Sequence, residues 1–260
     1  FNKSLTLDIE NRLMQYLLSV ENISRVHNSR TNQQNEYYTS EMLDEIFSEI
    51  WQSLNKKNKS LFPIESIIKD SAIFKASPFH KLTQKQINAK EEILTKIKES
   101  ILSNEDGQLI IVEGEAGSGK TVLMSTLLYE LGKYNLDLDE NLDIHLLVNH
   151  NEHVSIYSQI ASKLGIANKK NKIVQKPTSF INDNSSDEKV DVVIVDEAHL
   201  LLTQGKQSYQ GKNHLDDLLA RAKVVVIVFD IKQVLTTEQI WEIDKLNEYF
   251  DKAKSNSNHV

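Results

Sequence analysis

Cysteine is absent from this 260-residue sequence. Its absence excludes disulfide bonds, thiolate metal sites and a cysteine nucleophile, and is typical of the reducing cytoplasm. Long apolar runs are absent too, since the longest one, Val224 to Phe229, is far shorter than a membrane span. No basic and apolar leader opens the chain, which begins at Phe1 instead of methionine. We therefore expect a cytoplasmic protein without membrane contact, and we expect that an upstream part is missing.

Positive charge is also in short supply. The chain has 30 Lys and Arg against 37 Asp and Glu, a net charge of −7. This balance argues against a general nucleic-acid-binding surface, although it is compatible with a local basic groove. The length is sufficient for a sizeable core, so we expect one α/β domain with a smaller appendage.

The segment from Gly114 to Thr121 reads G-E-A-G-S-G-K-T and fits the phosphate-binding pattern G-x-x-x-x-G-K-[ST] without a mismatch. The apolar run Gln108 to Val112 predicts a buried strand before it, and Thr121 to Leu131 predicts an amphipathic helix after it. A glycine-rich turn that matched the pattern by chance would not need a strand before it and a helix after it. In such a loop, backbone N–H groups surround phosphate oxygens, here those of Gly114, Glu115, Ala116, Gly117, Ser118 and Gly119. Lys120 would contact the β- and γ-phosphates and Thr121 would bind Mg²⁺, so the predicted cofactors are ATP and Mg²⁺.

A second polar motif follows another apolar run. Val190 to Val195 predicts a buried strand, and Asp196-Glu197-Ala198-His199 stands at its end. Two adjacent carboxylates there suit the second half of a nucleoside-triphosphatase site. Asp196 would hold Mg²⁺, and Glu197 would orient or deprotonate the attacking water.

Two further apolar runs predict buried strands, Ile144 to Asn149 and Lys223 to Asp230. The helix after the first of them should end at Gly165, a typical C-terminal glycine. The polar piece from Ala167 to Lys189 is interpreted as an insertion or mobile loop. Its lysines could follow a phosphate backbone, but a solvated charge run is the commoner explanation.

Residues 1 to 78 are predicted to be helical and contain no phosphate or metal motif. Apolar residues at helical spacing form a wide stripe: Met42, Leu43, Ile46, Phe47, Ile50, Trp51 and Leu54. The stripe could dock a partner, but a core face is the commoner reason for such a pattern. We place the domain boundary near Pro78, giving a helical region at 1–78 and an α/β lobe at 79–260.

Gln86 has two compatible interpretations. Thr83 and Gln86 form the T-x-x-Q pattern of a helix capping box, which is a sufficient structural reason for both residues. Alternatively, the Gln86 amide binds the adenine of the nucleotide.

Together these motifs resemble those of a known family. The Thr83-to-Gln86 segment, G-E-A-G-S-G-K-T, D-E-A-H and Asp230-x-x-Gln233 stand in the order and spacing of the first RecA-like lobe of superfamily 1 helicases. The likeness is closer still to bacterial helicase-like ATPases catalogued as a domain of unknown function. D-E-A-H alone would suit the other large helicase superfamily, but the serine-alanine-threonine motif usual there is missing. Asp230-x-x-Gln233 therefore favours superfamily 1.

The resemblance implies a three-layer α/β, RecA-like P-loop NTPase lobe with a parallel sheet, preceded here by a helical N-terminal appendage. It also implies roles at matched positions. Lys120 and Thr121 would bind phosphate and Mg²⁺, Asp196 would bind Mg²⁺, Glu197 would be the catalytic base and Gln233 would sense the γ-phosphate. Asn149 and His150 stand where the family's first nucleic-acid-contacting motif would lie.

One departure from the family bears on function. Superfamily 1 enzymes have a second RecA-like lobe that supplies arginine fingers, and no second phosphate-loop pattern precedes Val260. Arg221 lies in a predicted helix and cannot be assigned as a finger. We therefore expect either a fragment or a one-lobe ATPase that needs a second lobe or partner to supply the arginine, with weak affinity for nucleic acid.

The expected function is ATP binding and Mg²⁺-dependent hydrolysis by the motor lobe of a helicase-like protein acting on DNA or RNA. The alternative is an ATP-dependent switch or scaffold module that controls a protein partner without translocation.

Overall fold

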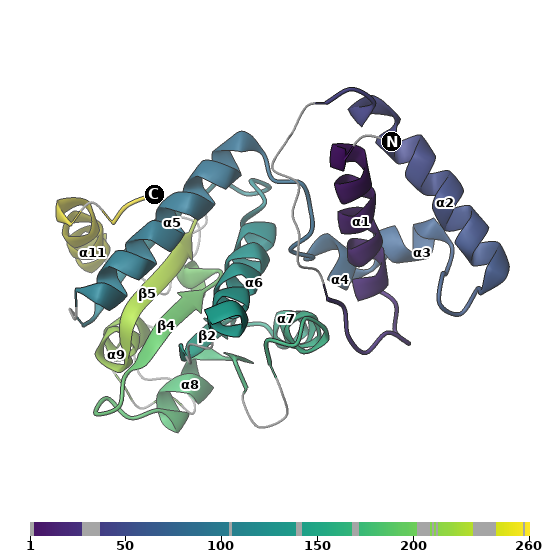
Figure 1. The fold of residues 1–260 in the computed structure, drawn as a ribbon. Coiled ribbons are helices and arrows are strands. Elements are labelled where there is room, and N and C mark those ends of the chain that lie inside the picture. The colour runs from purple at the N-terminus through teal and green to yellow at the C-terminus, as the bar shows by residue number, and fades with distance from the viewer. Residues whose placement is uncertain are drawn as a thin grey trace. The chain divides into compact units, whose positions relative to one another are not determined.

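Parallel strands form a single sheet in the computed structural model (Figure 1). The structure describes residues 3–27, 37–103, 106–138, 142–167, 172–201, 209, 211, 213–230, 243–256 and 258–260. The strands are β1 (Gln108–Glu113), β2 (Ile144–Leu147), β3 (Val174–Gln175), β4 (Val190–Val195) and β5 (Ala222–Phe229). Their order is β1-β5-β4-β2-β3, and every neighbouring pair is parallel. Parallel strands covered on both faces need apolar residues at successive positions, which explains the uninterrupted apolar runs at residues 192–195 of β4 and 224–229 of β5.

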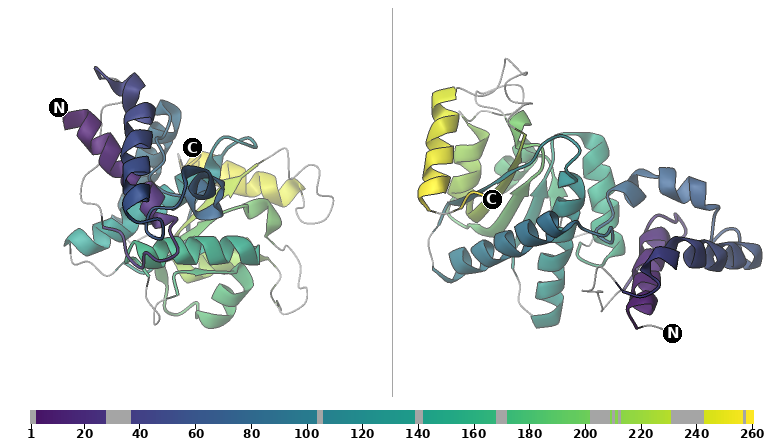
Figure 2. Two further views of the ribbon diagram at one scale, coloured as in Figure 1. Left: turned by 90° about the vertical axis from the view of Figure 1, so that its right-hand side faces the viewer. Right: turned by 90° about the horizontal axis from the view of Figure 1, so that it is seen from above.

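Helices cover both faces of the sheet (Figure 2). On one face, α8 (Pro177–Asp183), α9 (His214–Arg221) and α11 (Ile243–Ser255) pack in one apolar cluster with alternate strand residues. On the other, α5 (Gln84–Leu102) contacts β1 and β5, and α6 (Lys120–Leu138) contacts β2. The predicted α/β class with a parallel sheet, preceded by an N-terminal helical region, is confirmed. Among the described helices, none combines the length and apolar character that crossing a membrane requires.

The prediction of a mere insertion or mobile loop at 167–189 was wrong for part of that segment. β3 adds to the edge of β2, and α8 follows it directly. Pro177 stands at the start of α8, where its missing N–H costs nothing. Phe180 and Ile181 are buried in the core on one face of the helix. The element is too short, and its apolar residues too few, for a periodic pattern to stand out from the polar residues around it.

The described residues divide into two units, Phe1–Lys81 with Ile156–Asn168, and Leu82–Ser155 with Lys169–Val260. The first contains α1 (Lys3–Leu18), η1 (Ser40–Met42), α2 (Leu43–Lys57), α3 (Glu65–Asp70) and α4 (Ala72–Lys75). Its core is aromatic: the Tyr16 ring lies 4.7 Å from that of Phe47 and 4.8 Å from that of Trp51. Phe47 and Trp51 of the predicted stripe are buried in this core, as a core face requires, whereas Met42 at its start is 50 % exposed.

Helix α7 (Asn151–Lys163) ends two residues before the predicted glycine, Gly165. Gly165 has a φ of 74° and donates its N–H to the Ser162 carbonyl oxygen at 3.0 Å. A positive φ is readily adopted by glycine, so this C-terminal position suits it.

A buried histidine lies at the start of α9. The His214 side chain is 1 % exposed, its Nε2 lies 3.2 Å from the Thr178 hydroxyl, and its ring lies 4.1 Å from that of Tyr209. Burial lowers the pKa of His214 to about 4, and the attraction of the Asp217 carboxylate opposes the shift only in part. The folded protein therefore keeps His214 neutral at acidic pH.

This histidine predicts acid sensitivity. Between pH 6.5 and about 4, His214 is protonated in the unfolded chain but stays neutral in the folded protein. The free energy of unfolding therefore falls as the pH drops through this range. The expected loss is about 3 kcal/mol. Urea unfolding of wild type and His214→Gln at pH 7.5 and pH 4.5 measures it, with the exposed His27→Gln as control. Equal pH dependence in all three proteins would contradict the expectation.

Candidate functional site

Polar residues from four strands meet at one edge of the sheet. Glu113 at the end of β1 is paired with Phe229 of β5, and Val195 of β4 is paired with Ile227 of β5 and Leu147 of β2. The residues that follow these strands therefore lie at the same edge: Gly114, Asp230, Asp196 and Asn149. Because β5 lies between β1 and β4, Asp230 comes between the phosphate-loop sequence and the Asp196–Glu197 pair. Ligands of parallel α/β sheets typically bind at this carboxyl edge.

The predicted phosphate loop forms a tight turn between β1 and α6. Gly117 and Gly119 have φ values of 78° and 82°, which favour glycine. The loop begins with the Gly114 N–H donating to the Phe229 carbonyl oxygen at 3.1 Å, and Ser118 N–H donates to Glu115 O at 3.1 Å. A Cβ at Gly114 would lie 2.8 Å from the Ser118 hydroxyl, so this position has no room for one. Helix α6 starts at Lys120, which places its N-terminus and partial positive charge at the loop.

The Lys120 side chain bonds back to the backbone of the loop. Its Nζ donates to the carbonyl oxygens of Gly114 and Glu115, both at 2.8 Å, and lies 3.4 Å from Asp230 Oδ2. Asp230 is 2 % exposed, so this ion pair is largely shielded from water. In the sequence, Asp230 stood out only as part of the Asp230-x-x-Gln233 motif. Like Asp196, it is a carboxylate directly after a buried strand, and that position could have identified it as a site residue.

In the Asp196–Glu197 pair, the backbone of Glu197 is strained. Asp196 is 2 % exposed, and its Oδ1 accepts the Glu197 N–H at 2.9 Å. Glu197 has φ 54° and ψ 46°, a left-handed conformation that costs a non-glycine residue about 1–3 kcal/mol. Such strain is concentrated at functional sites, where the surrounding structure maintains it.

Two histidines lie beside the Glu197 carboxylate. Its Oε2 is 3.8 Å from His150 Nε2 and 3.6 Å from His153 Nδ1, distances too long for a direct hydrogen bond. Oε2 is buried and has no hydrogen-bond partner. His153 was missed from the sequence, although it lies in the first turn of α7, three residues after His150, which directly precedes that helix. Asn149, just before them, has a buried side-chain Nδ2 without a hydrogen bond.

His199, the last residue of the D-E-A-H segment, is also buried at this edge of the sheet. It is 7 % exposed, and burial lowers its pKa, while the Glu197 and Asp230 carboxylates act in the opposite direction and Lys120 reinforces the lowering. The residues of the D-E-A-H segment and Asp230 thus influence one another electrostatically.

Gln86 combines a capping role with a contact to the loop. The capping box with Thr83 is present, which confirms the structural interpretation. The same side chain also donates from Nε2 to the Ser118 carbonyl oxygen at 2.7 Å. Its binding to adenine stays a prediction. Gln233 lies outside the described residues.

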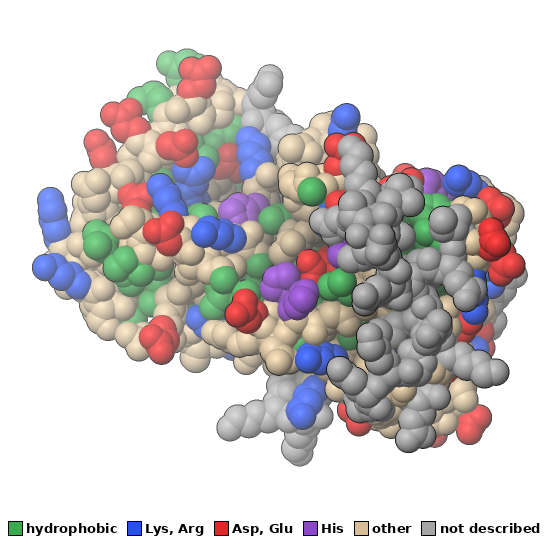
Figure 3. Space-filling model, turned by 180° about the vertical axis from the view of Figure 1, so that it is seen from behind, with side chains coloured by type: hydrophobic (Ala, Val, Ile, Leu, Met, Phe, Trp, Pro, Cys, Tyr) green, Lys and Arg blue, Asp and Glu red, His purple; other side chains and the backbone are tan. Residues whose placement is uncertain are grey.

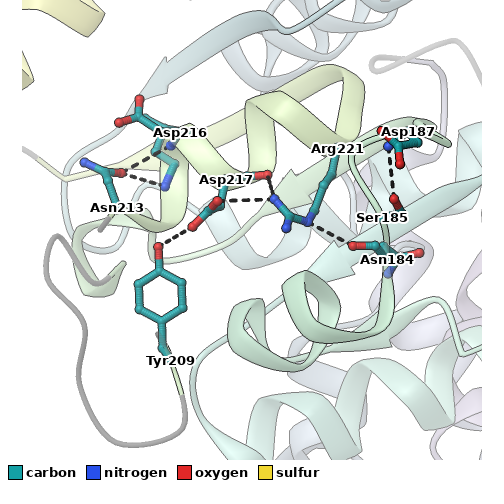
Figure 4. A network of polar contacts seen from close by, with 9 residues as sticks. Asn184, Ser185, Asp187, Tyr209, Asn213, Asp216, Asp217 and Arg221 are labelled. Atoms are coloured by element: carbon teal, nitrogen blue, oxygen red, sulfur yellow. Dashed lines mark hydrogen bonds and ion pairs between the residues drawn. The ribbon is translucent and has the colours of Figure 1, made fainter. Parts of the chain in front are cut away.

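Arg221 is remote from this edge. It is the last residue of α9, directly before β5, whereas the loop meets the other end of that strand. Eight strand residues separate the two ends, about 25 Å. Its guanidinium donates to the carbonyl oxygens of Asn184 and Asp217, both at 2.9 Å, and pairs with the Asp217 carboxylate (Figure 4). Arg221 therefore has a structural role, in line with its exclusion as a finger.

The parallel sheet, the Gly114–Thr121 loop after β1 and the Asp196–Glu197 pair after β4 define a helicase-like α/β domain. The model of the family described as Schlafen group 3, DNA/RNA helicase domain, matches residues 107–260, more than half of the chain. The chain belongs to this family. The helicase-like part of the resemblance is thus confirmed, while the narrower assignments, to the first lobe of superfamily 1 and to a bacterial domain of unknown function, stay predictions.

A yeast protein is also similar. "Uncharacterized protein YPL245W" of Saccharomyces cerevisiae is 34 % identical over an alignment of 185 residues, and this alignment covers 63 % of the present chain and 39 % of the yeast protein. The chain thus spans well under half the length of this relative.

Proposed function

We propose that this chain binds ATP with Mg²⁺ between the Gly114–Thr121 loop and the Asp196–Glu197 pair and hydrolyses it, as the motor lobe of a helicase-like protein acting on DNA or RNA. The observation that carries the proposal is the position of Lys120. Its ammonium group lies between the loop backbone and the buried Asp230 carboxylate, at the edge where Asp196 and Glu197 also stand. Membership of a helicase-domain family supports the same reaction class.

The loop is built to accept phosphate. Its residues 115–118 are exposed, so their backbone is accessible to a ligand. Lys120 Nζ would exchange the carbonyl oxygens of Gly114 and Glu115 for phosphate oxygens, which are stronger, charged acceptors. The N-terminus of α6 adds a favourable field for the negative charge.

The oxygen ligands here suit Mg²⁺. Within the described ranges, no group of three or more His, Asp and Glu side chains could hold a metal by itself. Mg²⁺ typically binds one or two protein oxygens and completes its shell with substrate phosphates and water. The Thr121 hydroxyl, at the exposed start of α6, and the Asp196 carboxylate would supply the protein oxygens. Mg²⁺ bound there would neutralise charge on the phosphates.

Glu197 is our candidate for the base. Its Oε2 accepts no hydrogen bond, so its acceptor capacity is unused. A carboxylate in this position would accept the proton of an attacking water. The imidazole rings of His150 and His153 border the carboxylate, each with a nitrogen within 4 Å of Oε2. Gln233 would sense the γ-phosphate.

Nucleic acid is the proposed partner, with weak affinity. On the face drawn in Figure 3, the described Lys and Arg side chains are interspersed with Asp and Glu. Nucleic-acid affinity depends largely on phosphate contacts from clustered basic residues, so this face would contribute little. Asn149 and His150, at the carboxyl edge of the sheet, are the proposed contacts.

Replacing Lys120 by alanine tests the proposal. Lys120→Ala should lose most ATP binding and all turnover, because it removes the cation that faces the phosphates. Ligand at about 100 times its Kd adds roughly 2.7 kcal/mol of stability, so Mg-ATP should raise the wild-type Tm by about 5–10 °C and leave the variant unchanged. Lys133→Ala, on the same helix but about 20 Å from the loop, is the matched control. Equal ATP binding by Lys120→Ala and wild type would remove the basis of the proposal.

A further inference from the structure

The Gln86 side chain joins helix α5 to the phosphate loop. Its Oε1 accepts the Thr83 N–H at 2.8 Å, which fixes the amide at the start of α5. Its Nε2 donates to the Ser118 carbonyl oxygen at 2.7 Å, thirty-two residues further along the chain. Both ends of the amide therefore bind backbone, and a capping box alone would use only the first of these two bonds.

The second bond fixes the orientation of one loop peptide. In a trans peptide the carbonyl and the following N–H point in opposite directions, so a Ser118 carbonyl turned toward Gln86 directs the Gly119 N–H away from it. Gly119 has a φ of 82°, and a Cβ there would collide with Gln86 Nε2. The end of the loop is thus packed directly against this amide. N–H groups of successive loop residues are the donors that bind phosphate in such turns.

We propose that Gln86 is a positioning residue: it holds the Ser118–Gly119 peptide in the orientation that binds phosphate. It thereby raises the affinity for any triphosphate, whichever base is attached. The inference rests on the proposed function, since it needs a triphosphate in the loop. It differs from adenine binding by Gln86, which would strengthen the binding of adenine nucleotides alone.

Binding of three ligands separates these roles. Mg-ATP, Mg-GTP and Mg-tripolyphosphate, which has no base, are titrated into wild type and Gln86→Ala. A hydrogen bond contributes about 0.5–1.5 kcal/mol, so the variant should bind all three more weakly by the same factor, about 2- to 12-fold. Gln84→Ala is the matched control, because Gln84 lies in the same helical turn but bonds only Asn88 of its own helix. It should bind all three ligands like wild type.

Two further variants separate positioning from capping. Thr83→Ala removes the hydroxyl half of the cap and leaves the Gln86–Ser118 bond, so it should lower the Tm slightly and leave the three affinities unchanged. Gln86→Glu keeps the acceptor for Thr83 N–H but has no proton for Ser118 O, so it should weaken all three ligands.

A loss confined to ATP would overturn the proposal and assign adenine binding to Gln86. Unchanged affinities in Gln86→Ala would overturn it in favour of capping alone. If the wild type binds none of the three ligands, the proposed function itself is overturned.

Discussion

Glu197→Gln should bind ATP as well as the wild type does and lose turnover by about 10²–10⁴-fold. The amide keeps the shape of the side chain, and the left-handed backbone at this position is unaffected by the change. Only the ability of Oε2 to accept a proton is lost. ATP should therefore remain bound and unhydrolysed, which separates binding from chemistry.

Measurement requires bound-nucleotide analysis together with a steady-state ATPase assay. Glu188→Gln is the matched control, because this exposed glutamate precedes the same strand at its opposite end. Asp196→Asn should behave differently and reduce the dependence of ATP binding on Mg²⁺. Wild-type turnover by Glu197→Gln would mean that the base is another residue.

Residues 1 to 260 by themselves should bind ATP and hydrolyse it very slowly. Charge develops on the γ-phosphoryl group in the transition state, and an arginine that meets it contributes about 10³–10⁵ in rate, or roughly 4–7 kcal/mol. Arg221 is held at the far end of β5 by Asn184 and Asp217. Among the described residues of the segment 107–260, no arginine lies at the site.

A steady-state assay with and without single-stranded DNA tests this expectation. Binding to the strand should be weak and should fall steeply with salt, because few phosphate contacts are available. Stimulation by nucleic acid would support a motor, whereas stimulation only by a protein would favour a switch. Turnover of several per second without any partner would show that the missing arginine is not needed.

Local sequence determined the elements on which the site is built. The pattern around Gly114–Thr121 specified strand, loop and helix, because Gly117 and Gly119 adopt a positive φ and Gly114 has no room for a Cβ. Thr83 and Gln86 specified the start of α5 for a similar reason, since a capping box spans only one helical turn. The buried strands β1, β4 and β5 followed from continuous apolar runs.

Tertiary structure alone decided which of these residues meet. Asp230 contacts Lys120 because β5 is inserted between β1 and β4, an order that no local pattern encodes. His153 faces Glu197 because α7 starts at the same edge of the sheet at which β4 ends. The contact of Gln86 with Ser118, and the distance of Arg221 from the loop, likewise depend on packing between segments far apart in the chain. Short-range periodicity reports how a segment folds, whereas the strand order, set by the burial of the whole sheet, determines what its ends touch.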